Sequence, residues 1–218
     1  MKLQLLSVNV GRPRAIQAGK GEPVSSAIGK TPVRDDKVRV GATNIDGDAQ
    51  ADLRVHGGPD KAVYAYSSDH WPWWEAEHRL ACAPATFGEN LTLGGAIEPN
   101  IAIGDRFRWG DALLEVSQPR APCYKFAIHT KRADAPQLMT VSARSGWYLR
   151  VIEAGDAPIR ESRIERVHAR GGPSVHDAFV ALLHPRASNE LQMRVYDAPA
   201  LAATWREGLA RRLAKSRR

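Results

Sequence analysis

The sequence predicts an α+β protein that begins with a mixed β-barrel or folded-over mixed sheet and ends in three short helices. Two observations support this prediction. Residues 1 to about 165 contain many short β-type segments with Gly, Pro, Asn and Asp between them, which is typical of closed or folded-over sheets. At Gly171-Gly172-Pro173 this pattern ends, and apolar residues then recur at helical spacing up to about residue 215.

The predicted strands are short segments bounded by turn residues. The first of them alternates apolar and polar residues. It is too short for the apolar region of a signal peptide and has no small-residue cleavage site. We therefore expect an N-terminal strand and a cytoplasmic protein. The predicted strands are residues 3–10, 37–45, 61–67, 100–110, 112–118 and 162–169.

One helix is predicted to interrupt the strands at residues 69–80. Ser68 or Asp69 is a suitable N-cap, and Pro72 falls in the first turn, where a missing N–H costs little. We expect Trp71 and Trp74 of this helix to pack into the core rather than to stack on nucleic-acid bases.

Three further helices are predicted at the C-terminal end. The first begins after Ser174, with Asp177 three residues later as in a capping box, and Pro185 ends it. The second spans about residues 188–196. The third follows Pro199 and has an apolar stripe at every fourth position: Leu201, Trp205, Leu209 and Leu213. We expect these helices to pack on one another or on the barrel.

The composition of the chain is that of a globular protein and not of a membrane-spanning one. With 218 residues, 43% hydrophobic and 25% charged, the chain is long enough to bury a core. No apolar run approaches the roughly 18 residues that a membrane-spanning helix needs, so we expect no membrane partner. Two cysteines cannot form a disulfide framework, and we expect both to stay reduced.

The net charge of +7 is concentrated at one end of the chain. Residues 206–218 contain six basic side chains and one acidic one, so the rest of the chain is close to neutral. Such a tail is compatible with a nucleic-acid contact, but a solvated helix end explains it more simply. We therefore expect no nucleic-acid partner.

Cys123 is the strongest candidate for chemistry. It lies in SQPRAPCYKF, residues 117–126, where Pro119 and Pro122 restrict the loop that presents it. Arg120 and Lys125 place positive charge near the thiol, which favours a thiolate nucleophile or a soft-metal ligand. These residues alone are equally compatible with a small buried side chain. The other cysteine, in LACAPA, is expected only to pack.

A second candidate segment is RVHGGPDKAVYAY, residues 54–66. Gly57-Gly58 permits close approach of the backbone to a ligand, and His56, Asp60 and Lys61 surround it with polar groups. The segment suits an anion cradle, but Gly-Gly-Pro-Asp is also simply a good turn.

Residues 87–92, FGENLT, place Glu89 and Asn90 beside a glycine, where they either face a ligand or complete a tight turn. No GxGxxG, Walker A or GxSxG motif occurs, and the histidines and cysteines do not have zinc-site spacing. Dinucleotide-binding, P-loop, serine-hydrolase and zinc functions therefore have no motif in this chain.

Taken together and in this order, these segments resemble the MOSC family of molybdenum-cofactor proteins, most closely its bacterial YiiM branch. The resemblance spans most of the chain. It is carried by SAIGKTPV (26–33), NIDGDAQADLRVHGGPDKAVYAY (44–66), FGENLTLGG (87–95), IGDRFRWGDALLEVSQPRAPCYKF (103–126) and SGWYLRVIEAG (145–155). It implies a mixed MOSC β-barrel of the pyruvate-kinase type over residues 1–168 and a C-terminal three-helix domain over residues 169–218.

The resemblance further implies a pterin-dithiolene molybdenum cofactor (molybdopterin), with Cys123 as the thiolate ligand of the metal. Arginine and lysine suit the cofactor's phosphate, Arg as a planar fork and Lys as a point charge. His56 and Asp60 are candidates to relay protons. The candidate cofactor contacts are Lys30, Gly57, Gly58, Lys61, Asn90, Arg120, Arg144 and Arg150.

The activity expected from this branch is reduction of N-hydroxylated compounds, such as 6-N-hydroxylaminopurine, to the amine, which detoxifies mutagenic base analogues. The chain has no flavin, haem or iron–sulfur motif, so a separate reductase must supply the electrons. The expected partners are this electron-donor reductase and a small N-hydroxylated substrate; a homodimer is left open.

Two other functions are compatible with the sequence. Cys123 is also suited to hold a sulfane sulfur, as in a persulfide carrier or transferase. A binding module that uses the tail at residues 206–218 would instead show strongly salt-dependent binding.

Overall fold

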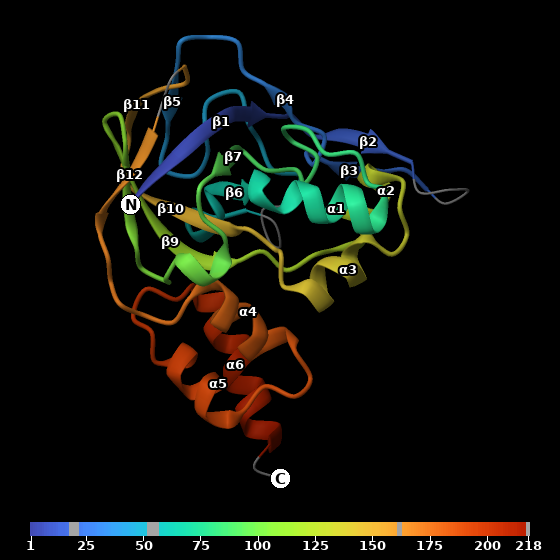
Figure 1. The fold of residues 1–218 in the computed structure, drawn as a ribbon. Coiled ribbons are helices and arrows are strands. Elements are labelled where there is room, and N and C mark those ends of the chain that lie inside the picture. Colours follow the sequence, from blue (N-terminus) through green and yellow to red (C-terminus); the bar gives the residue numbers. More distant parts are fainter. Residues whose placement is uncertain (18–21, 52–56, 161–162, 217–218) are drawn as a thin grey trace.

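The computed structural model describes residues 1–17, 22–51, 57–160 and 163–216. Within them, seven strands form a closed barrel in the order β12-β8-β9-β10-β6-β7-β1, because β1 also pairs with β12 (Figure 1). The pairing of β6 with β7 is parallel and the other barrel pairings are antiparallel. The barrel strands are β1 (Lys2–Val10), β6 (Val63–Ser67), β7 (Leu91–Gly94), β8 (Arg106–Trp109), β9 (Ala112–Pro119), β10 (Trp147–Glu153) and β12 (Arg163–His168).

Short strands extend the barrel at its edges. β4 (Thr31–Pro32) pairs with the end of β1, β5 (Lys37–Val40) pairs with β11 (Gly155–Pro158), and β2 (Arg14–Ile16) pairs with β3 (Val24–Ser26). The predicted α+β class with a mixed barrel is confirmed.

Three helices lie beside the barrel: α1 (Trp71–His78), α2 (Tyr124–Thr130) and α3 (Ala135–Ser142) (Figure 1). Single 3-10 turns occur at η1 (Pro59–Lys61), η2 (Ser68–His70) and η3 (Glu98–Asn100). Helix α1 matches the predicted helix, with Pro72 in its first turn. Helices α2 and α3 and strands β7 and β10 were not predicted; β7, for example, has only four residues, too few for a clear strand pattern.

A second cluster of buried residues packs under α1. Trp74 is fully buried there, and its Nε1 donates to the Tyr66 hydroxyl oxygen at 2.6 Å. The rings of Phe87 and Tyr66 stack 3.8 Å apart in the same cluster. Trp71 is half-buried at its border. These contacts give both tryptophans the packing role predicted for them.

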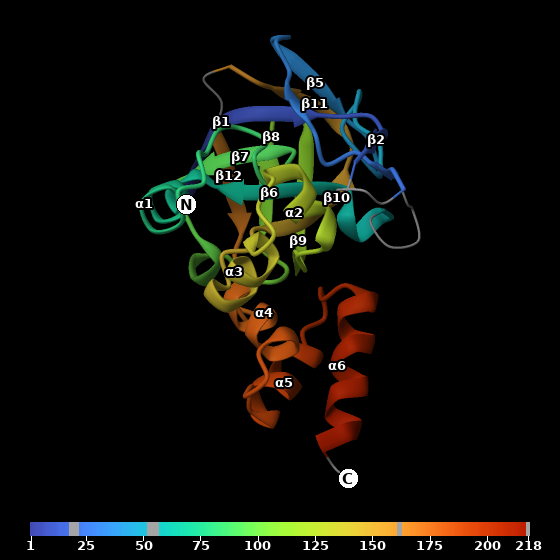
Figure 2. The ribbon, with the colours of Figure 1, turned by 90° about the vertical axis from the view of Figure 1, so that its right-hand side faces the viewer.

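The C-terminal helices α4 (Val175–Leu183), α5 (Asn189–Tyr196) and α6 (Ala203–Ser216) lie below the barrel in both ribbon views (Figures 1 and 2). Ser174 and Asp177 form the predicted capping box, with the Asp177 N–H donating to the Ser174 side chain at 2.9 Å. Buried residues of these helices belong to the same hydrophobic core as the barrel. The domain boundary at residues 168 and 169 stays a prediction, and the core is continuous across it.

Two arginines of the basic tail form hydrogen bonds within the C-terminal helical region. The Arg206 guanidinium donates to the Ala198 carbonyl oxygen at 2.7 Å, just beyond the end of α5. The Arg212 guanidinium donates to the Leu182 carbonyl oxygen at 2.7 Å, in the last turn of α4. Arg212 thereby pairs with a carbonyl that the end of α4 leaves without a helical partner, and Arg206 joins the loop after α5.

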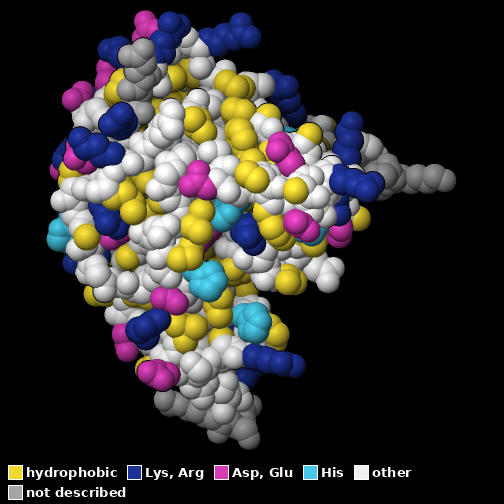
Figure 3. All heavy atoms as spheres, in the orientation of Figure 1, with side chains coloured by type: hydrophobic (Ala, Val, Ile, Leu, Met, Phe, Trp, Pro, Cys, Tyr) yellow, Lys and Arg dark blue, Asp and Glu magenta, His cyan; other side chains and the backbone are white. Residues whose placement is uncertain are grey.

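Other basic side chains are dispersed: on the face in Figure 3, Lys and Arg lie among acidic and apolar side chains. In the part of the chain that the structure describes, none of the helices combines the length and apolar character needed to cross a membrane.

Candidate functional site

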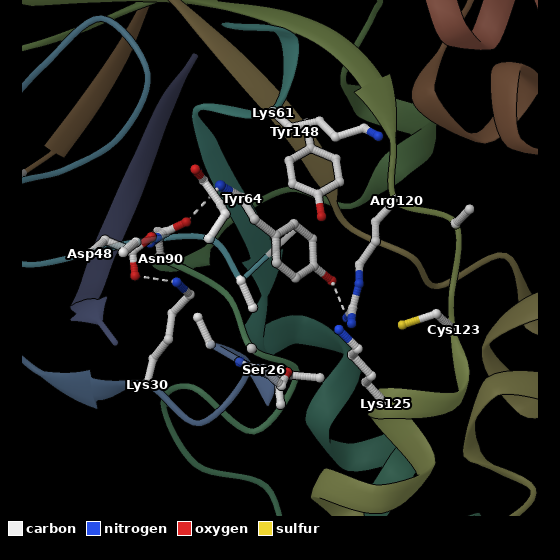
Figure 4. Close-up of a pocket in the computed structure, with 17 residues that line it drawn as sticks. Ser26, Lys30, Asp48, Lys61, Tyr64, Asn90, Arg120, Cys123, Lys125 and Tyr148 are labelled. Carbon is white, nitrogen blue, oxygen red and sulfur yellow. Dashed lines mark hydrogen bonds and ion pairs between the residues drawn. The ribbon is translucent and has the colours of Figure 1, made fainter. Parts of the chain in front are cut away.

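A cleft with an internal space of about 670 Å³, counted out to its opening to solvent, lies on one side of the barrel (Figure 4). The end of β9, the start of α2, strands β6 and β10, and the loops around residues 26–30, 48–51 and 88–90 contribute to its walls. Its polar and charged lining residues are Ser26, Lys30, Asp48, Gln50, Lys61, Tyr64, Asn90, Arg120, Cys123, Lys125 and Tyr148.

Cys123 lies between the end of β9 and α2. β9 ends at Pro119, and Cys123 is the extended residue immediately before the first turn of α2. Its carbonyl oxygen accepts from the Phe126 N–H at 3.0 Å, which fixes this junction. The Cys123 thiol is half-buried and points into the cleft (Figure 4). A thiol in this position can reach a ligand held in the cleft.

Arg120 is a buried cation with neutral partners. It is 6% exposed, and its guanidinium donates to the Phe87 carbonyl oxygen at 2.6 Å and to the Tyr64 hydroxyl oxygen at 3.3 Å. The guanidinium carbon lies 4.8 Å from the ring centre of Tyr64 and 5.3 Å from that of Phe126. These contacts hold the side chain but do not neutralise its charge, so the cleft is suited to an anion.

The floor of the cleft is a buried polar network. The Lys30 ammonium pairs with the Asp48 carboxylate, and the Asn90 amide donates to the other oxygen of Asp48 at 2.9 Å. Asn90 is itself fixed by Tyr64, whose N–H donates to the Asn90 side-chain oxygen at 3.0 Å. Burial lowers the pKa of Lys30, and the charge of Asp48 opposes that shift. The pair therefore brings little net charge to the cleft.

Two more lysines line the cleft. Lys61 ends η1, and burial lowers its pKa, against an opposing effect of Asp60. Lys125 lies in the first turn of α2, and its ammonium donates to the Ser25 carbonyl oxygen at 2.9 Å. With Arg120, these lysines make the cleft predominantly cationic.

Glu89 stands behind the cleft wall. Its carboxylate accepts from the backbone N–H groups of Ala85 at 2.8 Å and Phe87 at 3.0 Å, and from the Thr92 hydroxyl at 2.7 Å. Burial raises its pKa to about 7. Glu89 therefore orders the turn that presents the Phe87 carbonyl to Arg120, while its neighbour Asn90 faces the cleft.

Gly88 belongs to the same turn and lines the cleft. It has a φ of +74°, and a Cβ at this position would lie 2.6 Å from the Ile28 side chain. A side chain is therefore excluded here by both backbone conformation and space.

Several predicted site residues lie elsewhere. Gly57, Gly58, Asp60, Arg144 and Arg150 are not among the residues that line the cleft. The Asp60 carboxylate pairs with the Arg150 guanidinium at 2.9 Å, and the Arg144 guanidinium stacks on a tryptophan ring. The prediction for His56 lies outside the described residues. Lys30, Lys61, Asn90, Arg120 and Cys123 are brought together.

Asp48, Tyr64 and Tyr148 were not singled out from the sequence. Tyr64 and Tyr148 face each other across the pairing of β6 with β10, with ring centres 5.1 Å apart. Alternation along the strands could have placed each tyrosine on a face, but not on the wall of one particular cleft.

Cys82 is also half-buried but lies in a different environment from Cys123. Its thiol contacts the Leu80 carbonyl oxygen at 3.3 Å and does not line the cleft. Burial, with Glu75 nearby, raises the pKa of Cys82 to about 12, which disfavours a thiolate.

Comparisons with known proteins identify the family of the chain. The family model of the MOSC domain matches residues 52–164, which include β6 to β10, Arg120 and Cys123. The YiiM protein of Escherichia coli (strain K12) is 37% identical over 216 residues, covering 95% of this chain and 91% of that protein. The chain belongs to the MOSC domain family.

A solved structure of a related protein has the same fold as this MOSC protein. The crystal structure of YiiM from Geobacillus stearothermophilus superposes with a TM-score of 0.80 at 33% identity, over 97% of this chain and 99% of that one. A protein of Gibberella moniliformis (strain M3125 / FGSC 7600) named reductase is 36% identical over 156 residues, 70% of this chain but 27% of that protein. MOSC membership ties the function of the chain to the molybdenum cofactor.

Proposed function

We propose that this protein is a molybdenum-cofactor-dependent reductase that converts N-hydroxylated compounds, such as 6-N-hydroxylaminopurine, to amines. The observation that carries the proposal is the pairing, in one cleft, of the inward-facing Cys123 thiol with the buried Arg120, whose hydrogen-bond acceptors are neutral. The reductase name of the Gibberella moniliformis relative supports the same reaction class.

The cleft fits an anionic cofactor with a soft metal. A buried cation without a counter-charge is costly, and a bound phosphate would offset that cost at Arg120. Lys61 and Lys125 provide further positive charge at the cleft wall. Cys123 is the thiol that lines the cleft, and thiolates are suited to soft metal centres.

In this proposal Cys123 would ligate molybdenum, and Arg120, Lys61 and Lys125 would bind the cofactor phosphate. Asn90 and the Lys30–Asp48 pair would offer donors and an acceptor to the polar edge of the pterin. When bound, the cofactor supplies the two-electron chemistry that breaks the N–O bond, with the electrons coming from a separate reductase. The reaction consumes two protons and releases water.

We expect residues of the chain to deliver protons to the substrate. Asp60 and His56 remain candidates, but the Asp60 carboxylate is engaged by Arg150 outside the cleft. A group within the cleft is better placed to deliver a proton at the substrate oxygen.

A persulfide carrier or transferase that acts through Cys123 is the second candidate function. The half-buried thiol in a cationic cleft favours it, because positive charge would also stabilise a persulfide anion. It predicts cyanide-labile sulfur on the purified protein.

Metal content tests the proposal. Wild-type protein, Cys123→Ser and Cys82→Ser are purified from a host that makes the cofactor, and molybdenum is measured by mass spectrometry. We expect near-stoichiometric molybdenum in the wild type and in Cys82→Ser, and its loss with all reductase turnover in Cys123→Ser. Absence of both molybdenum and pterin from the wild type, with cyanide-labile sulfur present, would favour the carrier instead.

A further inference from the structure

Tyr148 presents an unused hydroxyl group inside the cleft. It lies on β10, and its ring packs against Tyr64 with ring centres 5.1 Å apart. Figure 4 shows the phenol oxygen directed into the cleft, on the side where Arg120 and Cys123 lie. The ring is thus held by packing while the hydroxyl faces the space that a ligand would fill.

The two cleft tyrosines differ in their hydrogen bonds. The Tyr64 hydroxyl donates to the Ser145 carbonyl oxygen at 2.8 Å and accepts from Arg120 at 3.3 Å. The Tyr148 hydroxyl forms no hydrogen bond with the residues that the structure describes. The Tyr148 side chain is half-buried and lines the open cleft, so its hydroxyl is left to water or to a bound molecule.

The electrostatic setting keeps the Tyr148 phenol protonated at neutral pH. Burial raises its pKa, and the positive charge of Arg120 only partly opposes this. The group is therefore a hydrogen-bond donor that faces the same space as the Cys123 thiol. A donor in that position suits an oxygen atom that gains negative charge during the reaction.

We propose that the Tyr148 hydroxyl binds the N-hydroxyl oxygen of the substrate and donates the proton with which that oxygen leaves as water. This inference rests on the proposed function. The N–O bond breaks with two electrons from the separate reductase, the oxygen takes the Tyr148 proton, and the nitrogen takes a second proton from water. Solvent at the cleft opening then returns a proton to the phenolate. One hydroxylamine, two electrons and two protons give one amine and one water.

The test uses molybdenum-loaded Tyr148→Phe, which removes the hydroxyl and keeps the ring against Tyr64. The first readout is binding of 6-N-hydroxylaminopurine and of adenine, its amine product, by calorimetry. We expect the wild type to bind the hydroxylated base more tightly, and this preference to fall about 3- to 10-fold in the variant, the worth of one hydrogen bond. The second readout is kcat, which we expect to fall about 100-fold with the loss of the acid.

Tyr124→Phe is the matched control. Tyr124 is next to Cys123 in sequence but is 58% exposed and does not line the cleft. We expect its binding preference, kcat and molybdenum content to equal those of the wild type.

Three outcomes would contradict the inference in different ways. Unchanged preference and kcat in an active Tyr148→Phe enzyme would overturn the role of Tyr148 alone. Loss of molybdenum from this variant would assign Tyr148 to the cofactor rather than to the substrate. A loaded wild type that neither binds nor reduces N-hydroxylated bases would refute the proposed function itself, whatever the variant does.

Discussion

Arg120 and Arg150 are two largely buried arginines of one barrel, and their surroundings differ. Arg120 faces the cleft, and its acceptors are the Phe87 carbonyl and the Tyr64 hydroxyl. Arg150 lies at the junction between barrel and C-terminal helices. Its side chain is 20% exposed. Its guanidinium contacts the carboxylates of Asp60 at 2.9 Å and Glu115 at 3.0 Å and the Ala200 carbonyl oxygen at 2.9 Å.

This difference in charge balance distinguishes a ligand-binding site, at Arg120, from a structural ion cluster, at Arg150. At the junction Arg150 and Arg106, which pairs with Glu115 at 2.7 Å, balance the two carboxylates, so the ion cluster is complete without a ligand. The Ala202 N–H also donates to the Ser117 carbonyl oxygen at 3.0 Å, which binds the segment before α6 to β9. In the cleft the positive charge is left for a ligand to neutralise. The family resemblance makes both arginines cofactor candidates, and only their neighbours distinguish them.

The largest expected effect on stability is at the junction. Arg150→Met leaves the Asp60 carboxylate without its cation and leaves Glu115 with Arg106 alone, and we expect the free energy of unfolding to fall by about 3 kcal/mol. Urea unfolding of the cofactor-free protein measures it. Arg108→Met is the control, because its pairing with Glu153 at 2.6 Å is exposed and should contribute about 0–1 kcal/mol. If the free energy of unfolding fell equally in the two variants, the Arg150 ion cluster would contribute no more to stability than an exposed ion pair.

A smaller effect is expected behind the cleft, at Glu89. Its pKa is raised from 4.5 to about 7 in the fold, so its contribution to stability is present below pH 4.5 and is lost as pH rises through about 7. Glu89→Gln has no such titration. We expect the stability of Glu89→Gln relative to wild type to improve by about 2 kcal/mol between about pH 4.5 and about pH 6.5.

Urea unfolding of wild type and Glu89→Gln at the two pH values measures how their stability difference changes with pH. Any pH-independent loss of hydrogen bonds in the variant cancels in this comparison. A wild-type to variant difference that does not change with pH would show that Glu89 ionises normally.

The smallest effect on stability is expected at Arg120. Because Arg120→Met removes a buried charge that has no carboxylate partner, the cofactor-free protein should change by less than about 1 kcal/mol or become more stable. Molybdenum retention should nevertheless be lost. Unfolding of protein from a host without the cofactor, and metal analysis of protein from a host with it, measure the two effects. A stability loss as large as that of Arg150→Met would mean that Arg120 is a structural residue.

Local sequence accounts for much of what was predicted correctly. The Ser174–Asp177 capping box, the strand before Cys123 and the helix at Trp71 each depend on residues a few positions apart. Strand β7 and helices α2 and α3 escaped prediction because their local patterns are short, and packing rather than periodicity decides them.

The sequence by itself determined the family and the α+β class, and it predicted Cys123 rather than Cys82 as the site cysteine, because ordered motifs and neighbouring residues carry that information. Only the tertiary structure decided that Asp48 and Tyr148 join Cys123 in one cleft, and that Asp60 and Arg150 pair outside it. The physical reason is that burial and charge compensation depend on residues distant in the chain, which the closure of the barrel brings together.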